Sequence, residues 1–148
     1  MNQGITNVYI TTSPQFSTLV VESIKPLNYS INKITANNYE IILDGSLIMA
    51  PDIIYVFDGL VNSITVTEKY KKSIITVSLE YHCNYQVKLE RQVPERLIIL
   101  FDRSFLKNLL KNRVIIIDPG HGGKDLGHRG YINLLEKNVV MDIANYLK

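Results

Sequence analysis

The chain has 148 residues, of which 46% are hydrophobic, and its net charge is +2 at pH 7. This length allows one average domain or two small ones, and the apolar content excludes a disordered chain. Basic and acidic residues are interspersed, no apolar run is long enough to span a membrane, and no signal peptide is visible, so neither nucleic-acid binding nor membrane insertion is indicated.

Short β-strands are predicted throughout the first hundred residues. In the segment 75–81, apolar residues alternate with polar ones, which is the pattern of a half-buried strand, and the segment 85–90 repeats it. Turn signals such as Ser13-Pro14 and Asp58-Gly59 separate these segments. Many short strands at this spacing predict a β-sandwich or barrel.

An internal repeat is also predicted. Asn28-Tyr29 and Asn84-Tyr85 lie 56 positions apart (84 − 28), and apolar positions match at the same offset. These matched pairs are Val8 with Ile64, Val21 with Val77, and Ile42 with Ile98. With a two-residue slip, the segment 43–46 also matches the segment 101–104. Chance coincidence among abundant valines and isoleucines is the alternative, and duplication is the preferred interpretation.

The segment 94–102 reads PERLIILFD. Together with the repeat, it resembles the AMIN domain, a β-sandwich targeting module of cell-envelope proteins. The resemblance implies that residues 1–105 form an AMIN-like β domain. Residues 106–113 then form a short connector, in which leucines at helical spacing predict a short helix.

Two potential metal ligands, His82 and Cys83, are adjacent in the sequence. On the strand predicted here, neighbouring side chains point to opposite faces, so these two are not expected to share a metal ion.

The stretch 114–136 carries the chemistry. Residues 114–117 are four β-branched apolar residues, which predict a strand buried on both faces, and Asp118-Pro119-Gly120 ends it. His121 follows between glycines, at the end of a strand where open α/β sheets bind ligands. Glu136 begins a stretch with apolar residues at helical spacing.

One histidine and one carboxylate make up two of the three protein ligands of a typical catalytic zinc site. Each residue also has a purely structural interpretation. His121 could simply cap the strand end, and Glu136 could complete a capping box with Asn133 as the N-cap residue. His128 is either a spare ligand or a solvent-facing loop residue.

The residues 117–123, IDPGHGG, then Gly130 and Glu136-Lys137, resemble the opening of a zinc-dependent N-acetylmuramoyl-L-alanine amidase domain. The resemblance implies that residues 114–148 are the N-terminal part of that domain, and that His121 and Glu136 bind zinc. Asp118 is a candidate to orient His121, or else a turn residue. In that family a second histidine and a general-base glutamate come later, beyond the position of Lys148, so no catalytic residue is expected within this chain.

The expected fold class is mainly β: a duplicated, AMIN-like β-sandwich followed by the first strand, loop and helix of an α/β amidase domain. The resemblance implies a cell-wall hydrolase that uses zinc-activated water to cleave the amide between N-acetylmuramic acid and L-alanine in peptidoglycan. It implies a location in the cell envelope or outside the cell, and the 148-residue chain alone is expected to be inactive. The alternative is a non-catalytic, peptidoglycan-binding module of the cell envelope.

Overall fold

A computed structural model describes residues 3–48 and 52–147 of the chain. The chain divides into two compact units, residues 1–111 and 112–148. The first unit consists almost entirely of β-strands: β1 (Gln3–Thr12), β2 (Phe16–Ser23), β3 (Tyr29–Lys33), β4 (Asn38–Asp44), β5 (Ser46–Leu47), β6 (Asp52–Tyr55), β7 (Val61–Lys69), β8 (Lys72–Leu79), β9 (Tyr85–Glu90) and β10 (Glu95–Asp102). A short helix, α1 (Leu106–Leu110), follows as the leucine spacing predicted.

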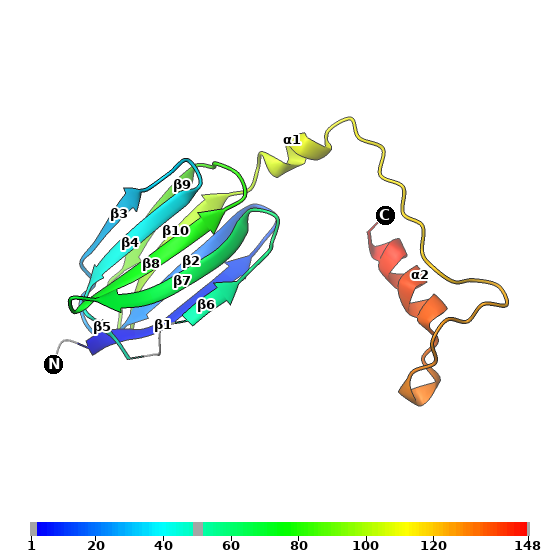
Figure 1. The fold of residues 1–148 in the computed structure, drawn as a ribbon, viewed down its shortest axis with the longest axis horizontal. Helices are drawn as coiled ribbons and strands as arrows, with labels where there is room; N and C mark the ends of the chain where they lie inside the picture. The colour runs from blue at the N-terminus through cyan, green and yellow to red at the C-terminus, as the bar shows by residue number, and fades with distance from the viewer. Residues whose placement is uncertain (1–2, 49–51, 148) are drawn as a thin grey trace. The chain divides into compact units, whose positions relative to one another are not determined.

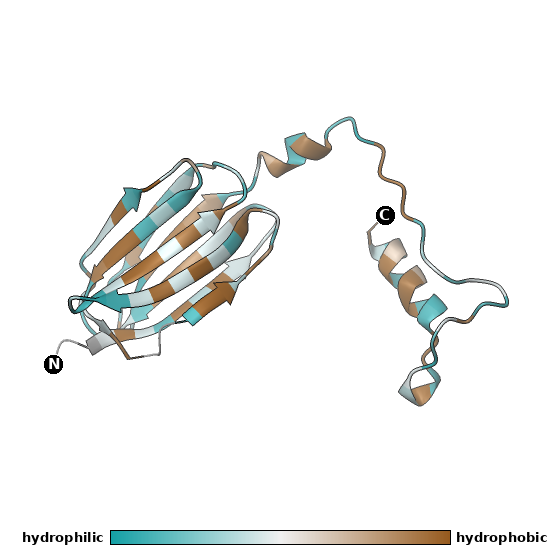
Figure 2. Ribbon diagram, viewed as in Figure 1, coloured by the Kyte–Doolittle hydropathy of each residue, from teal (hydrophilic) through white to brown (hydrophobic). Residues whose placement is uncertain are grey.

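The strands form a sandwich of two five-stranded sheets, in the orders β5-β1-β2-β10-β9 and β3-β4-β8-β7-β6 (Figure 1). Figure 2 shows apolar and polar residues alternating along the strands. Because side chains alternate between the two faces of a strand, one face of each sheet is apolar and packs inward. Both sheets contribute to one core, which includes Leu19, Val21 and Leu97 from the first sheet, and Ile41 and Ile75 from the second. The predicted mainly-β sandwich is confirmed.

The strand pairing repeats along the chain. Val8 pairs with Val21 in one sheet, and Ile64 pairs with Val77 in the other, so the two hairpins match at the predicted offset of 56 positions. The strand that pairs with the second strand of each hairpin, β10 in the first sheet and β4 in the second, matches with the predicted two-residue slip. Leu97 pairs with Val21 and Tyr39 pairs with Val77.

The two-residue slip changes one of the predicted matches. The slip makes Leu100 the equivalent of Ile42, because Leu100 lies three positions after Leu97 and Ile42 three after Tyr39. The predicted match of Ile42 with Ile98 is therefore wrong. Tyr29 and Tyr85 do occupy equivalent positions, opposite Leu43 and Phe101.

A largely buried ion pair fixes the turn between β6 and β7. Arg103 Nη1 lies 2.9 Å from Asp58 Oδ2, and the two side chains are only 14% and 7% exposed. Burial on its own would raise the pKa of Asp58, but hydrogen bonds from Ser17, from two backbone amides and from Thr12 outweigh burial and lower it. Arg103 also donates to Ser17 Oγ and to the carbonyl oxygen of Asp58. This network links β1, β2 and the end of β10 to the turn.

The second unit contains a 3-10 turn (Tyr131–Asn133) and the helix α2 (Glu136–Tyr146), which confirms the helical pattern predicted from Glu136 onward. The predicted strand 114–117 is wrong. The segment has no regular structure, and its four side chains are between 40% and 89% exposed. A strand needs a neighbour to hydrogen-bond with, and the described residues of this unit offer it none.

No described residue between 112 and 147 is buried. Hydrogen bonds, rather than a core, therefore hold the local structure of the second unit, as expected for so short a segment. Among the helices of the described residues, none has the length and apolar character that crossing a membrane would require.

Candidate metal centre

The loop that carries His121 has an unusual backbone. His121 has φ = 66°, in the left-handed region that non-glycine residues seldom adopt. Two backbone hydrogen bonds close the turn just after it: Gly122 N–H donates to the carbonyl of Asp125 (3.0 Å), and Asp125 N–H donates to the carbonyl of Gly122 (2.9 Å). Local hydrogen bonds thus hold the histidine in a conformation that costs backbone energy, which is a feature of many functional sites.

Glu136 is the first residue of α2, and two hydrogen bonds with the backbone of His128 fix its position. Its backbone N–H donates to the carbonyl of His128 (3.0 Å), and its Oε2 accepts a hydrogen bond from the N–H of His128 (2.7 Å). This second bond, followed by a smaller contribution from His121, lowers the pKa of Glu136. The carboxylate is therefore ionised at neutral pH, as a metal ligand must be.

The capping-box interpretation of Glu136 is wrong. The N-cap residue of α2 is Leu135, and no side chain caps the helix. Asn133 lies instead in the preceding 3-10 turn, where its side chain accepts a hydrogen bond from Arg129. The carboxylate of Glu136 reaches the backbone of His128, eight residues earlier, because the chain folds back between these two residues.

His121 and Glu136 lie side by side, although they are fifteen residues apart in the sequence. His121 Nε2 is 3.4 Å from Glu136 Oε2. That separation is longer than the usual N–H···O hydrogen bond. Two ligands of one tetrahedral zinc ion, with Zn–N and Zn–O distances near 2.1 Å, are separated by about 3.4 Å. The donor types and their spacing therefore fit two ligands of such an ion.

Asp125 engages the other nitrogen of the imidazole ring. Its Oδ2 lies 2.9 Å from His121 Nδ1, and its Oδ1 accepts a hydrogen bond from Gly127 N–H at 3.0 Å. The hydrogen bond to Asp125 is the main cause that raises the pKa of His121, and the same bond lowers the pKa of Asp125. The imidazole thus lies between two carboxylates, one at each ring nitrogen.

Gly127 packs directly against the pair. It has φ = 65°, and a Cβ built there would lie 2.8 Å from Glu136 Cβ, Glu136 Oε2 and His121 Cδ2. Only glycine allows the loop to pass this closely. Lys137 forms a second contact between α2 and the glycine loop, because its Nζ donates a hydrogen bond to the carbonyl of Gly123.

The remaining predicted residues lie as follows. Asp118, the candidate to orient His121, forms no hydrogen bond or ion pair within the described part of the chain; Asp125 contacts the ring instead. His128 is exposed, and its backbone, rather than its ring, contacts Glu136. No group of three or more His, Cys, Asp or Glu side chains that could hold a metal ion occurs among residues 3–48 and 52–147.

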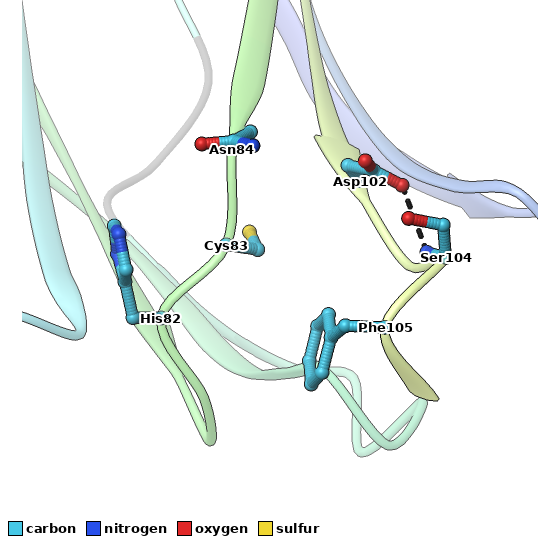
Figure 3. Close-up of a pocket in the computed structure, with 6 residues that line it drawn as sticks. All are labelled: His82, Cys83, Asn84, Asp102, Ser104 and Phe105. Carbon is cyan, nitrogen blue, oxygen red and sulfur yellow. Dashed lines mark hydrogen bonds between the residues drawn. The ribbon is translucent and has the colours of Figure 1, made fainter. Parts of the chain in front are cut away.

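A pocket in the first unit is a second candidate site (Figure 3). It has a volume of about 170 Å³ and is lined by His82, Cys83, Asn84, Asp102, Ser104 and Phe105. His82 and Cys83 lie in the loop before β9, not on a strand as predicted, and their side chains point apart as expected. Burial, then the charge of Asp102, raises the pKa of Cys83 to about 11. The thiol is therefore protonated at neutral pH and is a poor metal ligand.

Comparison with known proteins gives two partial matches. Residues 115–148 match the model of a family described as N-acetylmuramoyl-L-alanine amidase. The C-terminal segment is similar to these amidases. A Bacillus subtilis (strain 168) protein named "Putative N-acetylmuramoyl-L-alanine amidase YrvJ" is 53% identical over 38 residues. That match covers 26% of this chain and 7% of the relative.

Sequence reasoning missed two residues of this site. These residues are Asp125 and Gly127. The four-residue spacing between His121 and Asp125, across a glycine-rich turn, is a signal that could have revealed the first. The role of Gly127 depends on how the loop meets α2, which no local pattern encodes.

Proposed function

We propose that this chain is part of an N-acetylmuramoyl-L-alanine amidase, a cell-wall hydrolase that cleaves the amide between N-acetylmuramic acid and L-alanine in peptidoglycan. The family match of residues 115–148 supports this proposal. The observation that carries it is the 3.4 Å approach of His121 Nε2 and Glu136 Oε2, two zinc-type donors brought together by a loop and a helix.

In this proposal His121 and Glu136 hold a zinc ion. Bound zinc would polarise the scissile carbonyl and lower the pKa of a bound water. The roles of the chain's own residues follow from their contacts. His121 offers Nε2, and Glu136 offers a negative carboxylate that the N–H of His128 keeps in place. No general base is assigned within the chain, so we expect these 148 residues alone to be inactive on peptidoglycan.

The β-sandwich is proposed to be an AMIN-like module that directs the protein to the cell envelope. Its duplicated strand order supports this proposal, because each sheet combines a hairpin from one repeat with a hairpin from the other. The proposed location is accordingly the cell envelope or the cell exterior.

The test is a pair of measurements on the whole chain. Zinc affinity is measured by competition with a chromophoric chelator for the wild type, His121→Ala, Glu136→Gln and the control His128→Ala. The first two variants should bind zinc about tenfold more weakly or worse, whereas the control should match the wild type. Equal affinity in all four proteins would refute the site. The second measurement is stem-peptide release from purified peptidoglycan, and release that His121→Ala abolishes would refute the expected inactivity.

A second candidate function is that of a non-catalytic, peptidoglycan-binding module. One observation favours it: the buried residues among those described all lie in the first unit, where they form one hydrophobic core, and none lies between 112 and 147. Co-sedimentation of the chain with purified peptidoglycan tests this function. Binding that is unchanged by both His121→Ala and Glu136→Gln would assign it to the sandwich, and no binding at all would exclude it.

A further inference from the structure

We propose that Asp125 is the positioning residue of this site: it holds His121 in the tautomer with a proton on Nδ1, so that the Nε2 lone pair faces Glu136 and the metal position. The metal part of this inference rests on the proposed function. The tautomer part depends only on the contacts of the imidazole ring with Asp125 and Glu136.

The tautomer follows from the chemistry of the two contacts. An ionised carboxylate only accepts hydrogen bonds, so the 2.9 Å contact between Asp125 Oδ2 and His121 Nδ1 requires the proton on Nδ1. A neutral imidazole carries one N–H, which leaves Nε2 with a free lone pair. On the opposite side of the ring, Glu136 Oε2 lies 3.4 Å from Nε2, and this looser contact competes poorly for the proton.

Asp125 is itself held firmly enough for this role. Its second oxygen accepts the N–H of Gly127, and its backbone forms both hydrogen bonds of the turn with Gly122. Rotating the carboxylate away from the ring would break its hydrogen bond with the N–H of Gly127, and the turn holds the backbone of Asp125 in place. A ligand histidine usually donates its other N–H to a carboxylate or carbonyl in this manner, which fixes the ring and increases its donor strength.

Asp118 provides a matched control. It carries the same side chain on the same loop, three residues before His121, but forms no hydrogen bond or ion pair within the described residues. Replacing it removes one carboxylate from the loop without removing a contact to Nδ1. An effect that is specific to Asp125 therefore reports its contact with the ring rather than the loss of one negative charge from the loop.

The first experiment measures the tautomer of His121 in the metal-free chain by ¹⁵N NMR of its imidazole, at a pH where the ring is neutral. The wild type and Asp118→Asn should show the Nδ1–H form. Asp125→Asn should shift the population toward the Nε2–H form, because an amide can donate to Nδ1. An Nε2–H ring in the wild type would overturn the inference, whatever the variants do, as would an Nδ1–H ring that persists in Asp125→Asn.

The second experiment measures zinc affinity in the same proteins by chelator competition. Asp125→Asn should weaken binding by roughly 10- to 100-fold, and Asp118→Asn should leave it unchanged. Equal affinities in the wild type and Asp125→Asn, with a clear loss in His121→Ala, would overturn the positioning role while leaving the proposed site intact. If His121→Ala loses no affinity, the proposed function fails, and the tautomer measurement then stands by itself.

Discussion

Gly127→Ala should damage the candidate metal centre more than any other single methyl addition in the glycine loop. The new Cβ would lie 2.8 Å from Glu136 Cβ, Glu136 Oε2 and His121 Cδ2. Comfortable contacts between such atoms are about 3.5–4.0 Å, so the pair must move by roughly 0.7–1.2 Å. Metal ligands need to stay within about 0.5 Å of their working geometry. We therefore expect zinc affinity to fall by about tenfold or more.

Backbone strain needs a control, because Gly127 has φ = 65°. An alanine in the left-handed region costs about 1–2 kcal/mol in any loop. Gly123 has φ = 52° and nothing within 4 Å of a built Cβ, so Gly123→Ala introduces similar strain without the clash. Chelator competition on both variants separates the two effects. Equal losses of zinc affinity would refute the argument from close packing, and so would no loss in Gly127→Ala.

Two further predictions concern the stability of the β-sandwich. Asp58→Asn leaves the largely buried Arg103 without its charge partner and should lower the free energy of unfolding by about 3 kcal/mol, measured by urea denaturation at pH 7. The pKa of Asp58 is lowered from 3.8 in the folded state, so the contribution of its carboxylate to stability is present above about pH 4 and is lost as the pH falls through the folded-state pKa. The variant should therefore lose less stability on acidification than the wild type. Equal losses in the two proteins would contradict a stabilising role for the Asp58 carboxylate. Val21→Ala and Val77→Ala occupy equivalent positions of the repeat, both fully buried, and should each cost about 2–3 kcal/mol; a several-fold difference in their urea denaturation would contradict the equivalence.

Much of the first unit could be predicted because its signal is local and repeated. Alternation along β8 places Ile75, Val77 and Leu79 on the buried face. The offset of 56 positions between Tyr29 and Tyr85 predicts the second set of strands from the first. What the offset could not supply was which hairpins share a sheet, since that depends on long-range pairing.

The second unit was harder to predict for a physical reason. The β-branched run 114–117 has strong strand propensity, but strand formation depends on a partner, and the described residues of this unit provide none. The left-handed backbone of His121 comes from the turn hydrogen bonds between Gly122 and Asp125, not from the preference of histidine. The sequence therefore predicted which residue types form the site, but not the contacts that hold them.

The measurement that tests the central claim most directly is anomalous diffraction at the zinc absorption edge, from crystals of the chain grown with zinc. We predict one peak within about 2.0–2.2 Å of both His121 Nε2 and a carboxylate oxygen of Glu136. Zinc bound elsewhere, with Glu136 still hydrogen-bonded only to the N–H of His128, would contradict the claim.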